Sequence, residues 1–366
     1  MDQLSAHLDR GWELLSRGDA RGARASARRA LEIDTDSPEA HNLLGYAAAQ
    51  EGDADEALEH YRQAMALDDG YIDPMLNAAE VLIHPLQDYD EAVALCDEVL
   101  EFAEGREEVA DALLLKFDAL LAREDLDGAR RLLDDLPEGP YEGPMYPFLI
   151  GRAWYEVGEV DRADALLQDA LKQDPQNADA HYYLGLVRDE RRDWRGATLA
   201  FLESRELDLH APPPPWSLPH EAFHKSVERA LGGLDAELVR ALEGALVLVS
   251  DFPGMEVVAD GVDPRAAVLV EGLGDPAAAL PAAVVRVFVY QRNIERLCGG
   301  VEQLEDEVAW QLTEEVRHLL HPDEAPAEAP SPTASPARST TPAVVTASPS
   351  PEPEAPAKKK KPRKKA

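Results

Sequence analysis

Small residues recur in this chain with a period of 34, and that period constrains the fold more than any other feature. Gly11, Gly45 and Ala79 are 34 residues apart, and so are Gly151 and Gly185. Further small residues follow them at fixed offsets: Gly18, Gly52, Gly158, Ala23, Ala57, Ala163, Ala30, Ala64 and Ala170. Two antiparallel helices need small residues where they cross, and the turn between them needs a residue that tolerates positive φ. The pattern therefore predicts a stack of helical hairpins.

This spacing resembles that of the tetratricopeptide repeat, a helical hairpin of about 34 residues. Residues 4–209 hold six such units, near 4–37, 38–71, 72–107, 108–141, 144–177 and 178–209. The fourth unit departs from the pattern, because Phe117 and Glu124 stand where glycines belong. Prolines and glycines at 137–147 are expected to break the array into two sub-arrays. The resemblance implies an α-solenoid that acts as a scaffold for binding other proteins.

In such arrays the first helix of each hairpin lines a concave groove, and the family's chaperone-binding members place basic residues there. By position, the groove-facing candidates are Asn42, Tyr46, Gln50, Phe148, Arg152, Tyr155, Tyr182 and Asp189. The basic set is largely missing from them, so we expect a partner segment of neutral or basic character. The alternative for each aromatic residue is packing against the next hairpin.

Residues 210–219 include four consecutive prolines and predict a stiff extended linker. The chain then changes character over 220–324. We expect a helix at about 220–243, strands at 245–250, 267–273 and 284–290, and an amphipathic helix at about 301–321. The fold class is therefore mainly α: a solenoid followed by a small α/β domain.

This order of elements resembles the minimal zincin family of small zinc metallopeptidases. The resemblance rests on the stretch 267–273, the strand 286–292 and the last helix. In the family that strand is an edge beside the site, and the last helix carries His-Glu-x-x-His followed by an acidic ligand. Two histidines four apart share one helical face and bind Zn²⁺, while the glutamate acts as general base.

The match to that motif is incomplete. Glu315 stands at the position of the base and His318 at that of the second histidine, but Glu314 replaces the first. Glu324 falls near the third ligand, with Asp323 as the alternative. Two carboxylates and one imidazole make a poorer zinc site and raise the pKa of bound water. We therefore expect a domain that keeps the zincin fold, binds no cofactor and has lost its chemistry. The alternative is an active zinc metallopeptidase that receives its substrate from the groove.

A literal His-Glu-x-x-His also occurs, at His220, Glu221 and His224. It lies directly after the proline-rich linker, with no strand before it and no acidic ligand close behind. We interpret these histidines as polar residues in the first turns of a helix and keep them as an alternative metal pair.

Residues 325–366 are rich in Pro, Ala and Ser and end in a run with seven basic residues at 358–365. Such a segment cannot bury a core, so we expect a disordered tail. Its lysines are suited to weak, non-specific contacts with nucleic acid, or to transient contacts with the acidic body of the protein.

Composition bounds the remaining possibilities. The net charge of -35 disfavours binding of nucleic acid or anionic membranes by the body of the protein. The two cysteines, Cys96 and Cys298, lack metal spacing and suggest reduced thiols in the cytoplasm. No signal peptide and no membrane-spanning run is visible. The Ala-, Arg-, Glu- and Asp-rich composition is typical of a bacterium with GC-rich DNA.

Overall fold

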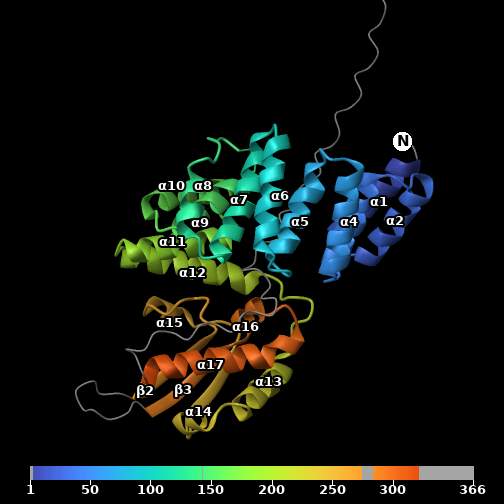
Figure 1. Ribbon diagram of the computed structural model, residues 1–366. Helices are drawn as coiled ribbons and strands as arrows, with labels where there is room; N and C mark the ends of the chain where they lie inside the picture. Colours follow the sequence, from blue (N-terminus) through green and yellow to red (C-terminus); the bar gives the residue numbers. More distant parts are fainter. Residues whose placement is uncertain (1–2, 142, 274–282, 321–366) are drawn as a thin grey trace, which may run out of the picture.

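The computed structural model describes residues 3–141, 143–273 and 283–320, and it begins with six helical hairpins (Figure 1). The first helices of the hairpins are α1 Gln3–Ser16, α3 Pro38–Gln50, α5 Ile72–Ile83, α7 Arg106–Ala122, α9 Met145–Glu156 and α11 Ala178–Glu190. The second helices are α2 Ala20–Ile33, α4 Ala54–Leu67, α6 Tyr89–Phe102, α8 Leu126–Leu133, α10 Val160–Gln173 and α12 Trp194–His210. Helices of one hairpin pack closely on each other, and neighbouring hairpins stack.

The predicted turn geometry is confirmed. Gly18, Gly52 and Gly158 have φ values of 77°, 83° and 80°. The other three hairpins place Gln87, Glu124 and Arg192 in the same left-handed conformation, with φ of 56°, 60° and 62°. These hairpins lack the glycine and keep the turn at the cost of local strain.

Small residues at the helix crossings explain the close packing. A Cβ added to Gly45 would lie 2.5 Å from the ring of Tyr61, and one added to Gly185 would lie 2.4 Å from that of Phe201. The alanines Ala23, Ala57 and Ala163 on the second helices are fully buried. The period of 34 therefore marks the contacts that hold each hairpin together.

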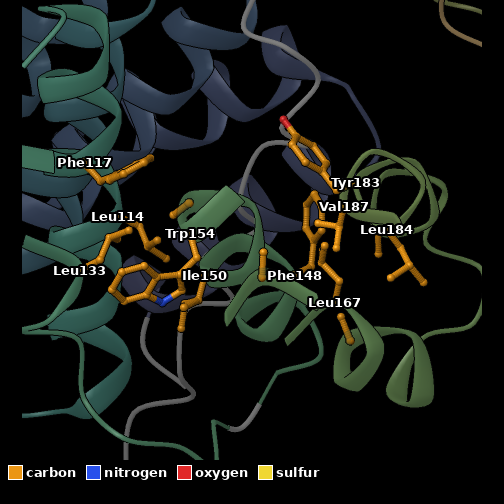
Figure 2. Packing of buried hydrophobic residues seen from close by; sticks show 14 of the residues in the cluster. Leu114, Phe117, Leu133, Phe148, Ile150, Trp154, Leu167, Tyr183, Leu184 and Val187 are labelled. Carbon is orange, nitrogen blue, oxygen red and sulfur yellow. The ribbon is translucent and has the colours of Figure 1, made fainter. Parts of the chain in front are cut away.

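The loop between α8 and α9 does not interrupt the packing. One hydrophobic cluster contains Leu114 and Phe117 of α7, Leu133 of α8, and Phe148 and Trp154 of α9 (Figure 2). It continues into α10 and α11. The segment at 137–147 thus lengthens a connection, while the hairpins on its two sides share one core.

A small three-stranded sheet follows the array. Its strands are β1 Leu246–Ser250, β2 Val268–Leu273 and β3 Ala283–Tyr290, in the order β1-β3-β2. β3 is parallel to β1 and antiparallel to β2. Within the described residues β3 is therefore the central strand, and our expectation of an edge strand at 286–292 was wrong.

Helices cover this sheet and close its core. They are α13 His220–Gly232, α14 Ala236–Ala241, α15 Met255–Ala259, α16 Gln291–Leu297 and α17 Leu304–Leu320, with a 3-10 turn at Val301–Gln303 before α17. The helix expected at 220–243 is thus two helices, separated after Gly232. The core combines Phe223 and Val227 of α13, Val287 and Val289 of β3, and Leu312 of α17. We refer to residues 220–320 as the C-terminal module.

The module is docked on the last hairpin rather than held at a distance by the linker (Figure 1). Trp216 and Leu218 of the segment 210–219 pack against the module's core. Ser217 donates a hydrogen bond of 2.8 Å to the buried carboxylate of Glu295, and the amide of Leu218 donates another of 3.2 Å. The proline-rich segment is therefore part of the packing between array and module.

Candidate functional site

One position of the repeat lines the inner face of the array, directly after the residue at the helix crossing. Its occupants in successive hairpins are Trp12, Tyr46, Glu80, Asp118, Arg152 and Leu186. Trp12 and Tyr46 meet edge to face with ring centroids 5.6 Å apart. Arg152 donates a hydrogen bond of 2.6 Å to Asp118. The repeat thus sets side chains of neighbouring hairpins next to one another along this face.

A cavity of about 320 Å³ lies in the middle of this face, and we call it the central groove. First helices supply nearly all of its wall. The lining residues are Leu76, Asn77, Glu80 and His84 of α5, Asp111, Leu114, Leu115 and Asp118 of α7, Met145, Phe148 and Leu149 of α9, and Asp174, Gln176, Asn177, Ala178 and Asp179 at the start of α11. Its floor is apolar and its charged groups are acidic.

Burial raises the pKa of the groove's carboxyl groups. The pKa of Glu80 is raised by burial and by the nearby charge of Asp118. Burial raises the pKa of Asp111 to about 6; a hydrogen bond from Tyr146 opposes this shift, and neighbouring acids add to it. Burial lowers the pKa of His84, so this imidazole adds little positive charge at neutral pH. The groove concentrates negative charge that water screens only partly.

The predicted groove residues of the second hairpin mostly bond to the array itself. Asn42 is buried, donates to the hydroxyl of Tyr71 at 3.2 Å and accepts from Asn77 at 3.1 Å. Gln50 donates to a backbone carbonyl of α1 at 3.4 Å. Tyr46 packs on Trp12 of the neighbouring hairpin, which is the packing role given above as the alternative for aromatic residues.

The remaining predicted residues divide among different roles. Phe148 lines the central groove, and Arg152 lies beside it, bound to Asp118. Tyr155 packs edge to face on Tyr183, and Asp189 is exposed. Tyr182 donates a hydrogen bond of 2.8 Å to Asp263 of the C-terminal module. Of the eight predicted residues, Phe148 alone lines the cavity.

Sequence reasoning missed the acidic residues of the groove, although the repeat contained the signal that places two of them. Tyr46 and Arg152 were both selected, and they occupy the same repeat position. Advancing 34 residues from Tyr46 gives Glu80, and stepping back 34 from Arg152 gives Asp118. No groove residue was predicted in the third and fourth hairpins, because their sequences depart most from the repeat pattern.

The contact between array and module is built on buried charge. Arg265 of the module binds Asp179 of α11 at 2.6 Å and Asp208 of α12 at 3.2 Å. Arg296 binds the other oxygen of Asp208 at 2.7 Å. The guanidinium of Arg265 also lies 4.4 Å from the ring centre of Tyr182. Asp179 also lines the central groove, so Arg265 of the module binds a residue of the groove wall.

The candidate metal ligands lie on two helices. Glu314 and Glu315 are partly buried on α17, and His318 is exposed there. Glu314 pairs with Arg317 at 3.3 Å. Burial raises the pKa of Glu315, and the nearby His318 lowers it. Asp323 and Glu324 lie outside the described residues.

His220, Glu221 and His224 are all exposed on α13. In the part of the chain that the structure describes, no three His, Cys, Asp or Glu side chains come together as metal ligands would. Among the described residues, the candidate ligands of α13 and α17 therefore do not converge on one point. Among the same residues, no helix is both long and apolar enough to cross a membrane.

Comparisons with known proteins concern the array. Residues 8–72 and 148–208 match one sequence model of the tetratricopeptide repeat, and residues 48–111 match another. Cellulose synthase operon protein C of Pseudomonas fluorescens is 29% identical over 204 residues, which cover 51% of this chain and 16% of that protein. The chain thus matches only a small part of this relative.

Two solved structures are similar over the same region. PilF of Pseudomonas aeruginosa has 21% identity and a TM-score of 0.49, with 57% of this chain and 93% of that one covered. PilW, described as a type IV pilus biogenesis factor, has 17% identity and a TM-score of 0.49, with 57% and 94% covered. The sequence matches and the six hairpins together show that the array is built of tetratricopeptide repeats.

Proposed function

We propose that the array is a scaffold for protein–protein interaction and that a segment of the partner protein lies in the central groove. The cavity of about 320 Å³ carries this proposal. Its volume falls in the range of sites that bind a few side chains, roughly 300–1,000 Å³. The groove combines apolar residues on its floor with a few polar groups on its sides, as peptide grooves in helical arrays do.

Charge limits the chemistry of the partner. The groove holds five carboxyl groups, and Arg152, the nearby cation, is already bound to Asp118. An acidic segment would meet repulsion in a half-buried place, which costs far more than at an open surface. A segment with neutral and basic side chains fits this groove best.

A peptide-binding measurement with a blocking variant tests this proposal. Random peptides displayed on phage are selected against the full-length protein, and the affinity of the enriched peptides is measured by fluorescence anisotropy. Met145→Arg puts a bulky cation at a residue of the groove wall that is 39% exposed. We expect Lys- and Arg-containing peptides to be selected and their affinity to fall at least tenfold in this variant.

The chain offers a matched control. Met255→Arg changes an equally flexible residue that is 58% exposed on α15, outside the groove. It should bind the selected peptides as the unaltered protein does. Equal affinity for both variants, or selection of acidic peptides, would exclude the central groove as the binding site.

For the C-terminal module we propose a zincin-like fold without peptidase activity. The substitution at Glu314 supports this, because its carboxylate already pairs with Arg317. The alternative function, a zinc metallopeptidase, is supported by Glu315 and His318 on one face of α17. Elemental analysis of the purified protein separates them: absence of stoichiometric zinc excludes the enzyme.

If zinc is found, two variants locate the site. Glu315→Gln should abolish peptidase activity if α17 carries the chemistry, while Glu221→Gln should leave it unchanged. The opposite result would assign the site to α13.

We also propose that the protein works in the cytoplasm. Cys96 and Cys298 are both buried as free thiols, and burial raises the pKa of each to about 12. Thiols protected in this way suit a reducing compartment. Fractionation of the source cells tests the location, and recovery with secreted or periplasmic proteins would contradict it.

A further inference from the structure

Three acids of the central groove form no ion pair among the described residues. Asp118 is paired with Arg152 and Asp179 with Arg265. Glu80, Asp111 and Asp174 are partly buried and lack such a partner, although Asp174 accepts a hydrogen bond of 3.0 Å from the amide of Gln176. Half-buried charge of one sign calls for a counter-charge, because the protein interior does not screen it as water does.

Arg152 does not neutralise these acids. Its side chain is 12% exposed, and one of its terminal nitrogens binds Asp118. The unpaired acids therefore favour a segment with basic side chains.

The apolar floor favours lysine. Leu76, Leu114, Leu115 and Leu149 line the groove below the carboxylates. A lysine side chain has a four-carbon stem that packs on apolar surface and an ammonium group that reaches polar partners beyond it. The groove therefore offers both halves of the side chain a suitable surface.

The chain itself contains such a segment. The run 358–365 holds seven basic residues among eight, in a chain with 36 basic and 71 acidic residues. It begins 38 residues after Leu320, where the described part ends. A connection of that length spans up to about 125 Å when extended. Tethering at this length gives the run an effective concentration on the order of 1 mM near the groove.

We propose that the lysine-rich run 358–365 docks in the central groove of its own chain, as an internal ligand that a partner must displace. The inference rests on the proposed function, because it uses the same groove. Other acids on the array would bind the lysine-rich run more weakly. Many are exposed and already paired, as Asp161 is with Arg191, and exposed ion pairs contribute little.

Methionine methyl signals can report where the run lies in the full-length protein. The chain has five methionines; Met145 lines the groove, and Met255 lies on α15 of the module. A nitroxide label on Ala357→Cys sits directly before the run, and the two native thiols are buried and protected from labelling. Relaxation by the label should broaden the Met145 methyl signal at least fivefold more than that of Met255. High salt should reduce the difference, because at 1 M the screening length falls to about 3 Å and the exposed part of the run is attracted less to the groove.

A double variant shows whether the unpaired acids hold the run. Glu80→Gln with Asp111→Asn should reduce the docked fraction by roughly tenfold or more, since it removes two half-buried ionic contacts. The control, Glu59→Gln with Glu101→Gln, removes two exposed acids from second helices and should change nothing. Circular dichroism confirms that each variant remains folded.

Several results would overturn the proposal. Equal broadening of Met145 and Met255, or none, means that the run stays free for other partners such as nucleic acid. Broadening that the groove double variant leaves unchanged also refutes docking at these acids. The scaffold function is judged separately: selected peptides that still lose affinity in Met145→Arg would preserve it even if the run does not dock.

Discussion

Replacing Asp111 with asparagine should stabilise the protein at neutral pH, although it removes a charge from a highly soluble surface. The carboxyl group of Asp111 lies in the groove wall, and burial raises its pKa from 3.8 to about 6. The charged form is therefore less favourable in the folded protein than in the unfolded chain. Asparagine keeps the size and the hydrogen-bond acceptor that Tyr146 uses, but carries no charge.

The size and sign follow from linkage. The folded state holds the proton of Asp111 more tightly, so the free energy of unfolding falls as pH rises from about 4 to about 6 and stays reduced above that. A shift of about two pKa units corresponds to about 3 kcal/mol at pH 7.5 and to about half of that at pH 5. Asp111→Asn should recover these amounts, less up to about 1 kcal/mol if the new amide nitrogen lacks an acceptor.

Urea titrations followed by circular dichroism measure the effect at both pH values. The comparison with Glu101→Gln removes the general effect of lowering the net charge, because Glu101 is exposed on α6. A gain for Asp111→Asn that is no larger at pH 7.5 than at pH 5 would refute the reasoning. So would an equal gain for Glu101→Gln, since the benefit would then come from net charge alone.

Three further substitutions test the packing of the array and its contact with the module. Gly45→Ala should lower the free energy of unfolding by about 1–3 kcal/mol, because the new Cβ would lie 2.5 Å from the ring of Tyr61 across the hairpin. In its control, Gly232→Ala, the new Cβ meets nothing within 4 Å, so the melting temperature should hardly change. Arg265→Ala should destabilise by about 3 kcal/mol and expose the connection at 211–219 to proteases, because it leaves Asp179 unpaired and Asp208 with Arg296 alone. Arg286→Ala, whose pair is exposed, should cost under about 1 kcal/mol. Glu124→Gly should raise the melting temperature slightly, by relief of up to about 1 kcal/mol of strain at a φ of 60°, and an unchanged or lower value would contradict that assignment.

The array could be predicted from the sequence because its signals are local and repeated. Gly18 and Gly52 mark turns, and Gly45 marks a crossing, at offsets that recur through the chain. Where a hairpin lacks the glycine, as at Gln87, packing on both sides keeps the left-handed turn. Local preference and repeat context agree closely enough that a stack of helical hairpins could be predicted from spacing.

The groove was harder to predict because register is lost where the repeats diverge. Glu80 and Asp118 are 38 residues apart rather than 34: the turn of the third hairpin has one extra residue, and three more lie between the turns at Gln87 and Glu124. Asn42 and Gln50 suggested a polar binding surface, yet both bond within the array. Polar residues at groove positions thus serve either packing or recognition, and spacing alone does not separate the two.

The contact between array and module could not be predicted, because its partners are distant in sequence and carry no pattern. Asp179 and Arg265 are 86 residues apart, and Asp208 and Arg265 are 57 apart. Four consecutive prolines suggested separation, whereas Trp216 beside them packs into the module. A repeat array needs its last hairpin covered, because each unit buries its apolar face only against a neighbour.

The module meets that need and also shapes the groove. Arg265 reaches from the module to Asp179, which forms part of the groove wall, and to Asp208 on α12. Asp208 also binds Arg296 of the module. Both carboxylates would be costly to bury without these guanidinium groups, so the last hairpin of the array depends on the module to neutralise them. These contacts involve none of the residues aligned with a zincin motif. Whatever chemistry the residues of α17 have, the module's role in supporting the array rests on Arg265 and Arg296.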